Sequence, residues 1–108
     1  MLIITENKII YKLGRNAKEN FQLIDEAYDI NDNYWWFHIS DHPSGHCIIF
    51  SKDITVDMIS TAANIVKQYS KLKDQKKIKI VYTQVKNVEK TKTIGQVLLK
   101  GSTNFISV

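Results

Sequence analysis

Residues 34–50 constrain the fold of this chain more than any other segment. They read Tyr-Trp-Trp-Phe-His-Ile, then a polar Ser-Asp-His-Pro-Ser-Gly link, then His-Cys-Ile-Ile-Phe. Apolar runs on both sides of a loop with proline and glycine indicate two strands rather than a helix. Successive side chains of a strand point to opposite faces, so Trp36 and His38 share one face and Trp35 takes the other. We therefore expect one of the two tryptophans to face away from the core.

The rest of the chain alternates β-branched runs with turn residues and two helical patterns. Asn16 is a good N-cap and Glu19 stands where a capping box needs it, which predicts a helix from there. A second, amphipathic helix is expected over about residues 55–72. Strands are expected at residues 2–5, 9–13, 35–39, 46–50, 78–83, 95–100 and 104–107, the last two forming a closing hairpin. The order ββαββαβββ predicts an α+β domain with two helices packed on one face of a mostly antiparallel sheet.

Length and composition narrow the class of protein. At 108 residues the chain is expected to form one domain, residues 1–108, and its hydrophobic fraction of 44% suits a globular core. The single cysteine excludes an internal disulfide framework and favours a reducing compartment. No apolar run approaches the roughly 18 residues that a membrane span needs. We expect a soluble, cytoplasmic protein that makes no membrane contact.

The positive charge is concentrated in the C-terminal part of the chain. Residues 1–66 carry five basic and nine acidic side chains, whereas residues 67–108 carry ten lysines against two acidic side chains. Such asymmetry suggests a polyanionic partner such as nucleic acid. The alternative is a solvated lysine surface without a specific partner.

The three histidines and the cysteine raise the questions of a metal site and of a catalytic thiol. Zinc sites combine three or four ligands at fixed short spacings, usually with more than one thiolate, and no such pattern is present. Cys47 lies in a run that reads as a buried strand, and His46 beside it points to the opposite face, so the two cannot pair as nucleophile and base. We expect no metal, no cofactor and no catalytic residue.

Trp36 and His38 are the sharper candidates for contact with a ligand. An exposed indole can stack a base of single-stranded nucleic acid, worth roughly 1–3 kcal/mol per base. A neighbouring histidine can also stack, or donate to a phosphate when charged. The alternative is that Trp36 fills the core and His38 is a buried polar group. The pattern leaves both open.

Phosphate contacts are expected at three further places. The start of the first helix offers backbone donors and cations, loop residues before the second central strand offer polar donors, and lysines after the strand at residues 78–83 can track a phosphate backbone. Ordinary capping and a solvated lysine surface are the alternatives. The candidate residues are Arg15, Asn16 and Lys18, then Ser44 and His46, then Lys86, Lys90 and Lys92.

Four blocks of the sequence stand in the order of a known family. The Trp-Phe-His run with Pro-Ser-Gly-His after it resembles the W-F-H…P-S-x-H signature of the NFACT-R domain, the RNA-binding module of the NFACT proteins. Residues 13–20 are similar to the glycine-x-asparagine-alanine-x-x-asparagine motif near the start of that domain, and residues 81–90 to its valine-tyrosine-threonine stretch. Gly-Gln-Val at residues 95–97 matches the glycine-x-valine of a late strand.

The resemblance implies a non-catalytic module that binds structured RNA. The implied partners are transfer RNA, ribosomal RNA or the large ribosomal subunit, in ribosome quality control. The large N-terminal domain, helix-hairpin-helix segment and coiled coil of full-length NFACT proteins have no counterpart in these 108 residues. We therefore expect a stand-alone short form, for which DNA is a possible partner too. A protein-interaction adapter with a lysine face, and an enzyme that acts on RNA through its histidines, are the alternatives.

Overall fold

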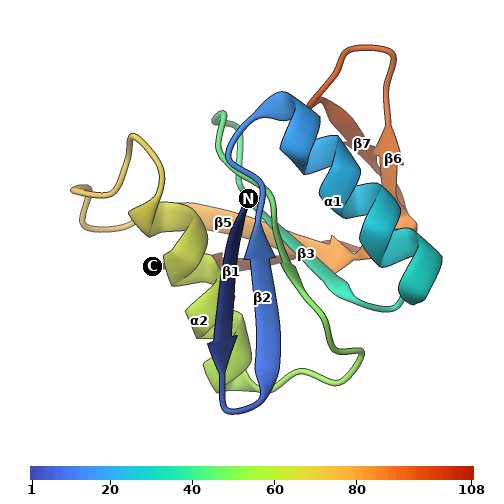
Figure 1. The fold of residues 1–108 in the computed structure, drawn as a ribbon. Helices are drawn as coiled ribbons and strands as arrows, with labels where there is room; N and C mark the ends of the chain where they lie inside the picture. The colour runs from blue at the N-terminus through green and yellow to red at the C-terminus, as the bar shows by residue number, and fades with distance from the viewer.

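Strands β3 (Trp35–Ile39) and β4 (Cys47–Ile49), formed by the aromatic segment, lie at the centre of the sheet (Figure 1). The computed structural model describes residues 1–108, and its six-stranded sheet has the order β1-β2-β4-β3-β5-β8. All neighbouring strands are antiparallel. The other four strands are β1 (Leu2–Glu6), β2 (Ile9–Leu13), β5 (Lys79–Gln84) and β8 (Asn104–Ser107).

Helices α1 (Ala17–Ile30) and α2 (Val56–Gln68) begin as the sequence predicts. The Glu19 N–H donates to the Asn16 side chain at 2.9 Å, and the Met58 N–H donates to the Thr55 hydroxyl at 3.2 Å. Each cap satisfies a backbone donor that has no partner inside the helix. Neither helix has the length and apolar character needed to cross a lipid bilayer.

The two helices pack on opposite faces of the sheet, and the expectation that they share one face is wrong. Side chains of α1 pack with Trp36 and Val81, whereas side chains of α2 pack with Phe37 and Ile80. Trp36 and Phe37 are adjacent in a regular strand and therefore point to opposite sides. The central strands are apolar on both faces, so both faces need a cover.

Both tryptophans are therefore covered, and the expectation that one would face solvent is wrong. Trp36 lies under α1 with 1% of its surface exposed. Trp35 is half-buried at the edge of the α2 side, where its indole N–H donates to the Lys52 carbonyl at 2.9 Å.

A second, two-stranded sheet closes the α1 side. After a single 3-10 turn, η1 (Val85–Asn87), strand β6 (Val88–Lys90) pairs with β7 (Val97–Leu99), and Figure 1 shows this hairpin beside α1. The closing hairpin predicted between residues 95–100 and 104–107 is wrong, since β8 pairs with β5 instead. The chain has one strand more than expected, and its α+β class with a mostly antiparallel sheet is confirmed.

Candidate nucleic-acid interface

A groove of about 1180 Å3 opens on the side of the sheet that α1 covers. Its floor includes side chains of β3 and β5. Its walls are the start of α1, the loop at residues 40–46, residues 69–71 after α2, the β6–β7 hairpin and β8. These segments come from the whole length of the chain, so the groove exists only in the folded domain.

The loop at residues 40–46 is held tightly against the start of α1. The Gly14 N–H donates to the His46 carbonyl at 2.9 Å, and the His46 N–H donates to the buried Asn20 side chain at 3.0 Å. A Cβ on Gly45 would lie 2.3 Å from the Gly14 carbonyl oxygen, so only glycine permits this backbone approach. One wall of the groove is therefore rigid.

Three aromatic rings form a cluster at the floor of the groove, and we call Trp36, His38 and His46 the ring cluster. Trp36 and His38 are stacked, with centroids 5.6 Å apart and planes 4° apart. The His46 ring meets both edge-on, at 5.2 Å and 5.1 Å. Offset-stacked and edge-to-face contacts are the favourable aromatic geometries, so the cluster is well packed.

The ring cluster is also electrically neutral and keeps free polar atoms. Burial lowers the pKa of His46 to about 3 and lowers that of His38 as well, so both rings are uncharged at neutral pH. The Trp36 Nε1 and His46 Nδ1 atoms are buried without a hydrogen-bond partner. The ring cluster therefore offers no charged histidine to pair with a phosphate.

Two other aromatic side chains on the rim of the groove are accessible. Phe105 on β8 is 50% exposed, and Tyr69 at the end of α2 is 56% exposed. The Lys79 ammonium lies 4.1 Å from the centroid of the Phe105 ring, within the range of a cation–π contact. These rings, rather than Trp36, present open surface to a planar ligand.

Few cations line the groove itself. Arg15 and Lys71 do, whereas the nearby Asp41 brings a negative charge. Lys90 forms an ion pair with Asp25 on α1, and Lys86 donates to the Asn33 side chain at 3.1 Å, both outside the groove. Lys71 is thus the only lysine of the C-terminal part that lines the groove.

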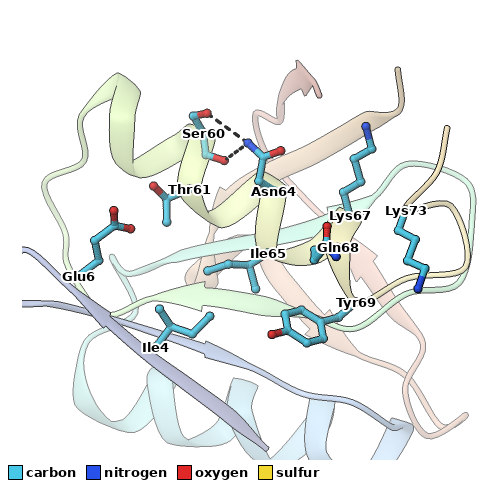
Figure 2. A pocket seen from close by; sticks show the side chains of 10 residues that line it. All are labelled: Ile4, Glu6, Ser60, Thr61, Asn64, Ile65, Lys67, Gln68, Tyr69 and Lys73. Atoms are coloured by element: carbon cyan, nitrogen blue, oxygen red, sulfur yellow. Dashed lines mark hydrogen bonds between the residues drawn. The ribbon is translucent and has the colours of Figure 1, made fainter. Parts of the chain in front are cut away.

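A second, shallower hollow of about 540 Å3 lies between β1 and α2 (Figure 2). Ile4 and Ile65 form its apolar part, and Lys67 and Lys73 stand at one end. Tyr69 lines this hollow and also the groove. The two concave surfaces are therefore contiguous at one exposed ring.

The histidines and the cysteine do not assemble a reactive centre. No group of three or more His, Cys, Asp or Glu side chains is placed to hold a metal ion. Cys47 is fully buried on the α2 side, and burial raises the pKa of its thiol far above the ordinary value. Its neighbour His46 points to the other face.

Comparison with known proteins identifies the family. The sequence model for the NFACT protein RNA binding domain matches residues 1–107. The chain belongs to the NFACT-R family. It is 31% identical over 78 residues to the Rqc2 homolog RqcH of Bacillus subtilis (strain 168), a match that covers 72% of this chain and 13% of that protein.

A solved structure has the same fold as this NFACT-R domain. It is the C-terminal part of the fibronectin/fibrinogen-binding protein from Streptococcus suis, with a TM-score of 0.87 at 21% identity. The similarity covers 98% of this chain and 44% of the other. The chain thus spans only a small part of the curated relative and less than half of the solved one.

The NFACT-R fold brings together some of the residues predicted as contacts and leaves others apart. Arg15 and Asn16 line the groove together with Trp36, His38, Ser44 and His46. Lys18, Lys86, Lys90 and Lys92 do not line it. The Ser44 hydroxyl accepts the Ile39 N–H at 3.2 Å, so it also braces the loop.

The expected anion site at the start of α1 is partly filled by the domain's own side chains. Asn16 caps the helix, and the Glu19 carboxylate accepts the Arg15 N–H at 3.1 Å and pairs with the Met1 ammonium at 2.9 Å. These contacts, together with the Arg15 charge, lower the pKa of Glu19. The Arg15 and Glu19 N–H groups are therefore occupied and are not available to a phosphate.

Sequence reasoning missed three rim residues, Tyr69, Lys71 and Phe105. The helix expected over about residues 55–72 would include Tyr69, but α2 ends at Gln68 and the Tyr69 ring is exposed. Phe105 lies on a strand whose partner was predicted wrongly. The serine at position 70, just past the helix end, and the isolated aromatic in a short terminal strand were the available signals.

Proposed function

We propose that this NFACT-R domain binds RNA through the groove, without catalysis, as a module of the translation machinery in the cytoplasm. Membership in a family of RNA-binding domains supports the RNA partner. Similarity to an Rqc2 homologue supports transfer RNA, ribosomal RNA or the large ribosomal subunit as the target, in ribosome quality control. The groove is the observation that supports this location of the binding site, because accessible rings and cations surround its packed floor.

The groove residues make two kinds of contact with RNA, ionic contacts to phosphates and stacking contacts to bases. Arg15 and Lys71 meet phosphates, while Phe105 and Tyr69 offer ring surface to bases. The neutral His38 exchanges hydrogen bonds rather than ionic contacts.

The lysines outside the groove meet more distant phosphates. Lys86 and Lys90 must give up their partners Asn33 and Asp25 to do so, and their net contribution is correspondingly smaller. Lys18 and Lys92 are exposed and have no such contact to break.

Fluorescence anisotropy with labelled RNA over a range of salt concentrations tests the proposal. The log affinity should fall linearly with log salt, by about 0.7 for each phosphate contact to single-stranded RNA. The double variant Arg15→Ala/Lys71→Ala should bind more weakly and reduce that slope by about 1.4. Transfer RNA, ribosomal RNA fragments and DNA of the same sequence compete in separate arms and identify the target.

The matched control is the double variant Lys8→Ala/Lys52→Ala. It removes the same amount of charge from exposed positions that line neither the groove nor the second hollow. Equal weakening by both double variants would show that charge alone is recognised and would refute the groove as the site. RNA affinity that does not change with salt would refute phosphate binding altogether.

A further inference from the structure

Tyr69 lines both the groove and the second hollow, and we call these two adjoining surfaces together the track. Lys71 and Phe105 also line the groove. Both aromatic side chains are at least half exposed although each is large and apolar. Exposed rings that line a concave surface are typical of a binding site rather than of an inert surface.

The chemistry of this track suits unpaired RNA better than a double helix. An A-form duplex presents phosphates and 2′-hydroxyls, and its bases are stacked on each other and cannot reach a protein ring. Unpaired nucleotides expose their base faces and stack on aromatic side chains. With two open rings and few cations, the track gains more from bases than from backbone charge.

The charges along the track agree with a polyanion that runs its whole length. Arg15 and Lys71 line the groove, and Lys67 and Lys73 line the second hollow; the acidic side chains are Asp41 in the groove and Glu6 in the hollow. The four cations outnumber the two carboxylates. In Figure 2, Lys67 and Lys73 lie on the other side of Tyr69 from Ile4.

We propose that this domain binds an unpaired RNA segment, which stacks bases on Phe105 and Tyr69 and continues past Tyr69 into the hollow between β1 and α2. The inference rests on the proposed function, because it names the kind of RNA that the groove takes. Phe105 and Tyr69 are its base-stacking residues, and Lys67 and Lys73 meet the phosphates beyond the groove.

The test compares a short single-stranded RNA with the same RNA annealed to its complement, using anisotropy and the full chain. The single strand should bind more tightly. Tyr69→Ala and Phe105→Ala should each weaken its binding about 5- to 150-fold, which corresponds to the loss of one stacked base. Tyr69→Phe and Phe105→Tyr should keep the affinity, because they keep the ring.

Tyr28→Ala is the matched control, since Tyr28 is 53% exposed on α1 and lines neither hollow. It should leave binding unchanged. Circular dichroism of each variant shows whether it is still folded, and so separates a loss of stacking from a loss of fold. The variants that keep an aromatic ring, Tyr69→Phe and Phe105→Tyr, provide a second check. Lys67→Ala/Lys73→Ala should weaken binding of a long single strand more than that of one short enough to fill only the groove.

The outcomes separate this inference from the proposed function. A duplex that binds as tightly as the single strand would overturn the inference and leave RNA binding intact. Alanine variants of Tyr69 and Phe105 that behave like Tyr28→Ala would also overturn it. If neither RNA binds at low salt, the proposed function fails and the inference fails with it.

Discussion

Acidification should destabilise this domain well above the pH at which carboxylates titrate, because of His46. The ring is 1% exposed and lies against Trp36 and His38. Burial lowers the pKa of His46 from its ordinary value of 6.5 to about 3, so the folded state keeps the ring neutral where the unfolded chain binds a proton. The stability that this neutral ring provides is complete above pH 6.5 and is lost progressively as the pH falls towards 3.

The magnitude follows from the two pKa values. Each pH unit below the unfolded value costs about 1.4 kcal/mol while the folded ring stays neutral. Between about pH 7.5 and about pH 5 the free energy of unfolding should therefore fall by roughly 2 kcal/mol from His46 alone. His38 adds a loss in the same direction, since burial lowers the pKa of its ring as well.

Urea unfolding followed by tryptophan fluorescence measures this effect at a series of pH values. The variant His46→Gln has no titrating ring at this position, so its stability should depend less on pH even if it is lower throughout. His42→Gln is the control, because His42 lies on the same loop but outside the ring cluster. A wild-type stability that stays flat from about pH 7.5 to about pH 5, or an unchanged pH slope in His46→Gln, would refute the reasoning.

Two further predictions concern the packing around the groove. Gly45→Ala places a Cβ 2.3 Å from the Gly14 carbonyl oxygen and should destabilise the fold by about 1–3 kcal/mol in urea unfolding; an unchanged midpoint would contradict the close approach of the loop to α1. Trp36→Ala removes a buried ring and should cost about 3–5 kcal/mol in the same assay, whereas a stable variant with lowered RNA affinity would show that Trp36 acts as a contact residue instead.

Local features of the fold could be predicted from the sequence because neighbouring residues produce them. The hairpin of β1 and β2 turns at Asn7 and Lys8, both with positive φ, as a two-residue hairpin turn requires. Asn16 caps α1, and the aromatic segment forms two antiparallel strands. The ordered motifs also predicted the NFACT-R family, which comparison confirms.

The strand pairing near the C-terminus could not be predicted from residues that are close together in the sequence. Residues 97–99 and 104–107 are separated by a short turn-like segment, which favours a hairpin by sequence alone. In the structure β8 pairs with β5 and β7 with β6, because these partners let Val88 and Val97 pack on the α1 side.

What the sequence by itself determined was both helices, most of the strands, the Asn16 cap and the family, because periodicity and capping depend on residues close together in the chain. Only the tertiary structure decided which surfaces are exposed to solvent. Alternation shows that Trp36 and Phe37 face opposite ways, but whether a face is open depends on helices that arrive from elsewhere in the chain. The helix packed on the Trp36 face buried that indole, whereas Phe105 and Tyr69 stayed exposed on the rim of the groove, since exposure is a property of the packed domain and not of a segment.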